Sequence, residues 1–256
     1  MRVGLVLSGG GARGIAHIGV IKALEEAGIT FSAVSGTSAG SIVGALYAYG
    51  YKPDEIMGII KEVKAFRFLQ PAMSWKGILK MDVLHKFLEK YLPENNFESL
   101  KIPLHVAATN VRTGITEFFS SGNLIGALCA SSCIPVLFDP VVYEGELYID
   151  GGILNNLPCE PLKNTCNVLI GSHSNPIGHD FDPKNARLVM ERALLLAISC
   201  NVYSRRSQCD FFIEPLGLES YKVLDLTNMD DIYRIGYEQT LKQIEEQKII
   251  ERCNEF

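Results

Sequence analysis

The feature that most constrains the fold is a short apolar run, RVGLVL at residues 2–7, that ends at a cluster of glycines. A run of this length bounded by glycines is typical of a strand buried on both faces of a parallel sheet. Residues 14–27 then carry apolar side chains at helical spacing and stop at Gly28, which predicts a helix with a glycine C-terminal stop. A buried strand followed at once by a helix indicates an α/β fold.

This alternation of strands and helices continues along the chain. Further strands are expected at residues 31–34, 103–109, 115–119, 167–171 and 210–216, with a hairpin at 141–149. Further helices are expected at 38–50, 54–64, 81–91, 123–131, 184–203 and 230–251. We therefore predict one domain over residues 1–256: a mainly parallel central sheet with helices on both faces. Its motif-bearing core covers about 3–165 and its C-terminal helical portion about 184–256.

Charge and composition exclude several classes of protein. The net charge of −5 argues against a nucleic-acid-binding surface, which needs clustered Lys and Arg. The longest strongly apolar run, residues 193–198, is far short of the roughly 20 residues of a membrane-spanning helix, and the N-terminus lacks a signal-peptide core. The 7 cysteines form no C-x-x-C pair. We expect a cytoplasmic protein with reduced thiols and no metal site.

The first motif that carries chemistry is SGGGARG, residues 8–14, between the first strand and the first helix. Glycines there leave backbone N–H groups uncovered, which predicts an anion-binding loop; the alternative is a glycine turn without a ligand. The letters also fit G-x-G-x-x-G, but the acidic residue that a dinucleotide fold needs about 20 residues later is missing. The Gly-Lys-Ser/Thr ending of a phosphate-binding P-loop is also missing.

The second motif is GTSAG, residues 36–40, at a predicted turn from a strand to a helix. G-x-S-x-G in this context is typical of a nucleophile elbow, where the serine takes strained backbone angles and flanking glycines relieve crowding. The alternative is an ordinary tight turn, since such turns favour small residues. Ser35 precedes the turn and Ser41 lies within the helix, so Ser38 is the candidate nucleophile.

A serine nucleophile needs a base, and the residues leave two choices open. Ser38, Asp150 and either His173 or His179 follow the chain order of the α/β-hydrolase triad. Alternatively, Asp150 acts directly, from the DGG motif at residues 150–152. A carboxylate with a pKa near about 4 is a weak base at neutral pH, so this second choice requires a partly desolvated site. Asp150 is also a common residue type in ordinary turns.

The three motifs together, in this order and context, resemble the patatin-like phospholipase family, in particular its short single-domain bacterial members. The resemblance extends over roughly residues 3–160 and includes the linking segments GIAHIGVIKALEEAGI and ASSCIPVLFDPVVYEGELYIDGGILNNLP. It implies a three-layer α/β/α fold and a serine hydrolase of lipid esters, of the phospholipase A, lysophospholipase or carboxylesterase type, with an acyl-enzyme intermediate.

The resemblance also implies roles for individual residues. Ser38 is the nucleophile, Asp150 is its base, and no histidine, metal or organic cofactor takes part. Backbone N–H groups of the loop Gly9, Gly10 and Gly11 form the oxyanion hole. The supporting positions of the three motifs are Arg13, Gly14, Gly36, Gly40, Gly151 and Gly152. Arg13 is expected either to brace the loop or to meet an anionic head group.

A lipid or acyl ester is the expected partner. The segment FRFLQPAMSW, residues 66–75, is interpreted either as a lid or peripheral membrane contact, or as ordinary core. A non-catalytic lipid-binding regulator on the same fold is the alternative of a different class. The intact Ser38 and Asp150 argue against it.

Overall fold

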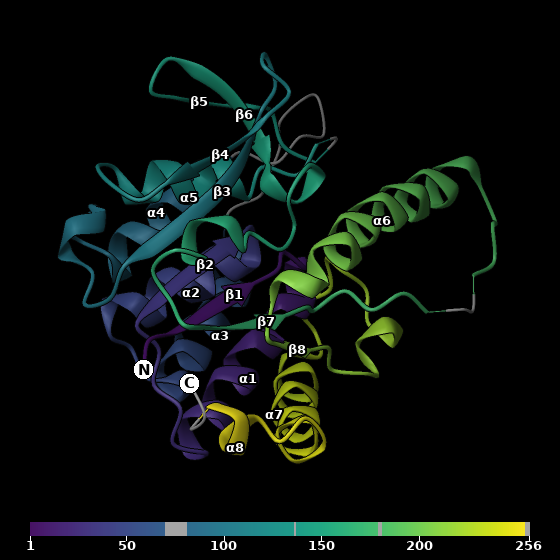
Figure 1. Cartoon of the computed structure of the whole chain (residues 1–256). Coiled ribbons are helices and arrows are strands. Elements are labelled where there is room, and N and C mark those ends of the chain that lie inside the picture. Colours follow the sequence, from purple (N-terminus) through teal and green to yellow (C-terminus); the bar gives the residue numbers. More distant parts are fainter. Residues whose placement is uncertain (70–80, 136, 179–180, 254–256) are drawn as a thin grey trace.

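The computed structural model describes residues 1–69, 81–135, 137–178 and 181–253, without the side chains of 64–69, 187 and 191. Its centre is an 8-stranded sheet in the order β5-β6-β3-β2-β1-β7-β8, with β4 also paired to β3 (Figure 1). The strands are β1 (Val3–Leu7), β2 (Ala33–Thr37), β3 (Leu104–Asn110), β4 (Thr116–Phe119), β5 (Val141–Tyr143), β6 (Glu146–Asp150), β7 (Val168–Ser172) and β8 (Phe211–Ile213). The α/β fold class is thus confirmed.

The helices mostly lie where the apolar periodicity predicts them. They are α1 (Ala16–Glu26), α2 (Ala39–Tyr49), α3 (Pro53–Leu69), α4 (Asp82–Tyr91), α5 (Leu124–Ser131), α6 (Ala186–Arg205), α7 (Met229–Glu246) and α8 (Ile249–Cys253). Short 3-10 helices are η1 (Gly11–Ile15), η2 (Phe97–Ser99), η3 (Gly151–Ile153), η4 (Glu160–Leu162), η5 (Arg206–Gln208) and η6 (Leu218–Ser220). The expected helix at 230–251 is instead divided into α7 and α8, because Lys248 has a φ of 51° that no α-helix accommodates.

The sheet is parallel at its centre and antiparallel at one edge. Strand β1 pairs in parallel with β2 and β7, β2 with β3, and β7 with β8. The antiparallel part consists of β4 and β6 beside β3, together with the β5–β6 hairpin. The hairpin follows from the local sequence, but its attachment to β3 depends on contacts between distant parts of the chain. This attachment places the end of β6 beside β3, which in turn pairs with β2.

The two faces of the sheet are covered differently. Leu5 and Leu7 of β1 belong to the main core, which includes residues of α1, α2, α5 and α7. Val6 points to the other face and packs in a smaller cluster with Leu162 of η4 and Val202 of α6. On the second face, η4 and one end of α6 cover the sheet. Figure 1 shows α6 extending away from the rest of the molecule.

The register of the sheet brings two distant motifs to the same edge. Thr37, the last residue of β2, lies opposite Ala107 of β3. The next residue of β3, Ala108, lies opposite Asp150 on the other side. The residues that follow β2 and those that end β6 thus flank the carboxyl-terminal half of β3, which is the edge where open α/β sheets bind ligands.

Several other expectations have simple outcomes. Cys129, Cys133, Cys159 and Cys253 are buried, whereas Cys200 is exposed, so the cysteines are not all core thiols. No helix in the described ranges is long and apolar enough to cross a membrane. Helix α3 runs to Leu69, but the rest of the segment 66–75, and its side chains, lie outside the described residues.

Candidate active site

Ser38 occupies a strained turn between β2 and α2. Its φ of 51° and ψ of −125° are unusual for a residue with a side chain and fit the geometry of a nucleophile elbow. The flanking positions require glycine because neighbouring backbone atoms lie very close to them. A Cβ at Gly36 would lie 2.7 Å from the Ser41 nitrogen, and one at Gly40 would lie 2.5 Å from the carbonyl oxygens of Leu7 and Ser8. Larger residues would force this turn open.

Two neighbouring serines hold the turn. The backbone N–H of Ser38 donates to Ser131 Oγ at 2.8 Å, and the Ser131 hydroxyl donates to the Ala107 carbonyl at 2.6 Å. The Ser41 hydroxyl donates to the Ser38 carbonyl at 2.6 Å, so Ser41 supports the turn from within the helix. Sequence reasoning did not single out Ser131. Its role depends on α5 packing against β3, which no local pattern indicates.

Asp150 ends β6 and its side chain meets that of Ser38. Both residues are nearly buried, at 7% and 5% exposure. The carboxylate accepts a hydrogen bond from the Gly152 N–H at 2.8 Å. The Ser38 side chain is the other neighbour that acts on its pKa. Burial raises the pKa of Asp150 to about 6, although the Ser38 side chain and the Gly152 N–H both act to lower it. A carboxylate with a pKa close to neutrality is a better proton acceptor than an exposed one.

The glycines of DGG also meet close contacts. A Cβ at Gly151 would overlap the Ala107 carbonyl, and one at Gly152 would lie 3.0 Å from Asp150 Oδ1. A side chain at Gly151 would separate the β6 end from β3, and one at Gly152 would crowd the Asp150 carboxylate. Since β3 also carries the acceptor of Ser131, both halves of the site depend on the same strand.

The glycine loop lies directly against Ser38. A Cβ at Gly9 would come within 3.1 Å of Ser38 Cβ, and one at Gly14 within 2.6 Å of Ala39 Cβ. The Gly9 N–H already donates to Asn156 Oδ1 at 2.9 Å. Among the described residues we find no acceptor for the N–H groups of Gly10 and Gly11. These two groups are therefore the free donors of the loop.

Gly11 has a positive φ of 54°, and a Cβ there would overlap the Val223 carbonyl. The same carbonyl accepts the Ala12 N–H at 2.7 Å, so the loop is attached to the segment around Val223. Arg13 strengthens this attachment. Its buried guanidinium donates to the carbonyls of Tyr221, at 2.7 Å, and Glu219, at 3.2 Å. Of the two roles expected for Arg13, these contacts fit the bracing role.

Two asparagines that sequence reasoning missed connect the parts of the site. Asn156 accepts from Gly9 through its side chain, and its backbone N–H donates to Asn201 Oδ1 at 2.9 Å. Asn201, on α6, in turn donates to the Gly152 carbonyl at 3.0 Å. The amide-rich sequence NN that follows DGG was the available signal for Asn156. Nothing in the local sequence marks Asn201.

The histidines take other positions. His17 is buried between Ser172 Oγ at 2.9 Å and the Ser8 carbonyl at 2.8 Å, and burial lowers its pKa to about 4. His173 is buried beside Glu214, with 2.9 Å between Nδ1 and Oε1. This contact is made on the side of β8, and no hydrogen bond joins His173 to Ser38. His179 lies outside the described residues.

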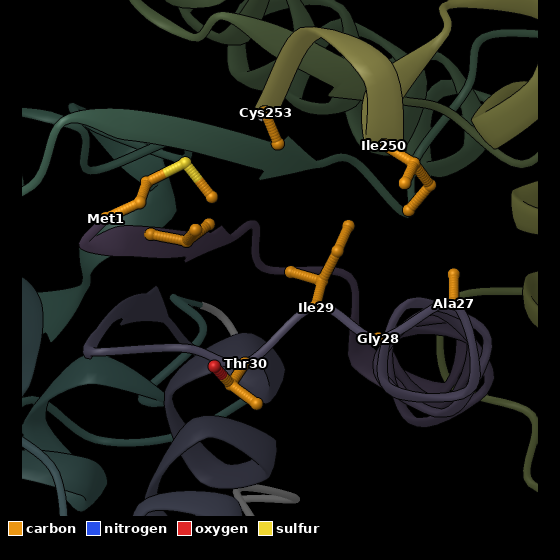
Figure 2. A pocket seen from close by; sticks show the side chains of 8 residues that line it. Met1, Ala27, Gly28, Ile29, Thr30, Ile250 and Cys253 are labelled. Carbon is orange, nitrogen blue, oxygen red and sulfur yellow. The ribbon is translucent and has the colours of Figure 1, made fainter. Parts of the chain in front are cut away.

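Figure 2 shows a pocket near the start of β1, at the other end of this strand from the glycine loop. It has a volume of about 100 Å³ and is lined by Met1, Val3, Ala27, Gly28, Ile29, Thr30, Ile250 and Cys253. Val3 begins β1, whereas the glycine loop follows its end. This pocket is therefore remote from Ser38 and has no part in the candidate active site.

The sequence matches a known protein family over more than half of its length. The patatin-like phospholipase family matches residues 5–163, which include all three motifs. The chain belongs to this family. The family and the α/β fold class expected from the sequence are thus confirmed, and membership supports a lipid ester hydrolase.

Individual relatives agree with this assignment. The lysophospholipase NTE1 of Kluyveromyces lactis is 30% identical over 270 residues, which cover 92% of this chain but 18% of the yeast protein. An uncharacterized NTE family protein of Mycobacterium tuberculosis is 38% identical over 164 residues, covering 63% of this chain and 45% of its own length. The chain thus spans less than half of each of these relatives.

A solved structure supports the fold. The crystal structure of VipD from Legionella pneumophila superposes with a TM-score of 0.58 at 18% identity, covering 96% of this chain and 67% of VipD. At this level of identity the similarity concerns the fold.

Proposed function

We propose that this patatin-like protein is a serine acyl hydrolase that cleaves ester bonds of lipids through a Ser38–Asp150 dyad. The observation that carries the proposal is the strained, buried Ser38 beside the buried Asp150, a carboxylate whose pKa is raised to about 6. The lysophospholipase relative supports a lipid substrate. This chemistry suits phospholipase A, lysophospholipase and carboxylesterase substrates alike.

The first half of the reaction forms an acyl-enzyme. Ser38 Oγ attacks the ester carbonyl carbon while its proton passes to Asp150. The carbonyl oxygen becomes an oxyanion, and the N–H groups of Gly10 and Gly11 are the donors available to stabilise it. Asp150 then returns the proton to the leaving alcohol as the tetrahedral intermediate collapses. The Gly9 N–H, held by Asn156, fixes the loop and takes no direct part.

The second half releases the acid. Asp150 accepts a proton from water, the resulting hydroxide attacks the acyl carbon, and the Gly10 and Gly11 N–H groups again stabilise the oxyanion. The proton on Asp150 then returns to Ser38 Oγ as the fatty acid leaves. No histidine is needed, since the partner of Asp150 is Ser38 and that of His173 is Glu214.

The proposal is tested by incubating the protein with a mixed lipid extract and measuring released fatty acids. Wild-type protein is expected to release them and Ser38→Ala is not. Equal release by both proteins would reject the dyad. Lipid binding without release by the wild type would favour a non-catalytic regulator on the same fold.

The pH dependence of hydrolysis follows from the raised pKa of Asp150. The base acts only when ionised, so kcat/KM for a short p-nitrophenyl ester should fall about tenfold per unit below a midpoint near pH 6 and level off above it. An imidazole would titrate in a similar range, so the His173→Gln variant is the control. The midpoint should stay the same in that variant. Its disappearance there would assign the titration to His173.

Ionisation of Asp150 should support activity but lower the free energy of unfolding. A carboxyl whose pKa rises on folding, here from 3.8 to about 6, destabilises the fold once it is ionised above that value. Asp150→Asn should therefore raise the free energy of unfolding by about 2–3 kcal/mol near pH 8 and by little near pH 4. Urea denaturation at both pH values measures this difference.

Asp230→Asn is the matched control for this measurement. The Asp230 side chain is exposed and pairs with Lys61, so its removal should change stability by less than about 1 kcal/mol at either pH. Unchanged or lower stability of Asp150→Asn at pH 8 would show that the buried carboxylate is not a source of strain.

A further inference from the structure

The outer half of α6 exposes apolar side chains that a helix of a globular protein normally buries. Met190 is 66% exposed and Leu194, one turn later, 36% exposed. Val189 and Leu196 are exposed as well. Figure 1 shows this half of the helix lying away from the sheet and from the other helices. An apolar surface of this kind favours contact with a partner.

The inner half of the same helix is attached to the candidate active site. Asn201 bonds to the Gly152 carbonyl and to the Asn156 N–H, as described above. Arg205 donates to Glu160 Oε1 at 3.1 Å, and Asn155 donates to the other oxygen of Glu160 at 2.9 Å. The exposed apolar half is therefore a rigid extension of the element that contacts the turn after Asp150.

Other exposed apolar residues belong to segments next to the glycine loop. Leu216 and Leu224 are exposed on the two sides of the segment that Arg13 and Ala12 bind. Phe181 is also exposed and lies under the Arg192 guanidinium, at 5.4 Å from ring centroid to Cζ. Arg192 donates to the Gly178 carbonyl at 2.6 Å. Apolar groups thus occur on α6 and on the loops that pack around the site.

We propose that the outer half of α6, around Met190 and Leu194, inserts into a lipid surface and brings Ser38 to its substrate. This rests on the proposed function, because a lipid ester is held in a bilayer or micelle and has to be reached there. Residues 181–198 contain three basic and two acidic side chains, so their charge is close to zero. Burial of apolar area, with little attraction to anionic head groups, therefore drives the contact. A second copy of the chain bound to α6 would instead cover the helix that contacts the turn after Asp150.

Vesicle binding tests the proposal directly. Binding to phosphatidylcholine vesicles is measured by co-sedimentation in a Ser38→Ala background, so that turnover does not alter the lipid. Leu194→Asp should lower the apparent partition coefficient about tenfold or more, and Met190→Asp with Leu194→Asp should lower it further. Leu241→Asp is the matched control, since Leu241 lies on α7 with 39% exposure, close to the 36% of Leu194. It should bind as the parent does.

Insertion of α6 into lipid differs measurably from an electrostatic contact and from self-association. Equal vesicle binding by the Leu194 and Leu241 variants overturns the proposal, and so does a loss of binding on raising salt, which would indicate an electrostatic contact. Sedimentation velocity detects a second copy: a dimer that dissociates in Leu194→Asp, with vesicle binding unchanged, also overturns it. Thermal unfolding verifies that each variant is folded. Vesicle binding without any release of fatty acid by the wild type would reject the proposed hydrolase and leave the lipid contact standing.

Discussion

Replacing Ser38 by alanine is expected to reduce kcat for ester hydrolysis by about 10⁴-fold or more, because no other group forms the acyl-enzyme. Asp150→Asn is expected to reduce it by about 10²–10⁴-fold, since the amide cannot accept the serine proton. Asparagine keeps the shape of the side chain. Its amide oxygen can still accept the hydrogen bond that the Gly152 N–H donates to Asp150 at 2.8 Å. Initial rates with a short p-nitrophenyl ester, on protein verified as folded, measure both losses.

The double variant and one histidine variant decide between the dyad and the triad. Ser38 and Asp150 act as a unit, so combining their substitutions should cost about as much as Ser38→Ala alone. His173→Gln should keep kcat within about tenfold of wild type, because its partner is Glu214. A loss as large as that of Asp150→Asn in folded His173→Gln protein would replace the dyad by a triad.

Gly11→Ala is expected to reduce kcat by about 10²–10³-fold, the usual cost of losing one oxyanion donor, with a smaller effect on KM. The reason is steric. A Cβ at Gly11 would overlap the Val223 carbonyl, which is backbone and also holds the Ala12 N–H. The loop has to shift to accommodate the methyl group, and the N–H groups of Gly10 and Gly11 then move relative to Ser38 Oγ.

Gly114→Ala is the matched control for Gly11. Gly114 has a similar positive φ of 68°, but a Cβ there would meet nothing within 4 Å. Both variants carry the same backbone strain of about 1–2 kcal/mol, so their unfolding temperatures should fall alike from that cause. Turnover should fall only in Gly11→Ala. Equal turnover in the two variants would separate the glycine loop from oxyanion stabilisation.

Much of the fold was predictable from local patterns. The apolar run of β1 and the helical spacing of α1 depend on periodicity alone, and both lie where expected. The Ser38 turn was predictable because its glycines and its position between a strand and a helix form one local motif. The break at Lys248 was not predictable. Apolar spacing continues across it, and only the backbone angle of that residue, 51° in φ, ends the helix.

The supporting residues of the site were much less predictable. Ser131, Asn156 and Asn201 each act through hydrogen bonds to residues that are distant in sequence or in another element. A polar residue of this kind has no periodicity, and its neighbours carry no signal for it. The Gly9 N–H is a similar case. It belongs to the same motif as the N–H groups of Gly10 and Gly11, yet it donates its hydrogen bond to Asn156.

The sequence alone determined the family, the strand-to-helix elbow at Ser38 and the pairing of Ser38 with Asp150 as a hypothesis, because glycine spacing and strand ends are local properties. Only the tertiary structure decided that β6 lies beside β3, where Asp150 is buried against Ser38. It also decided that His173 faces Glu214 and that α6 carries its apolar half outward. These are outcomes of packing between elements, and burial, which sets the pKa of Asp150, exists only once those elements are assembled.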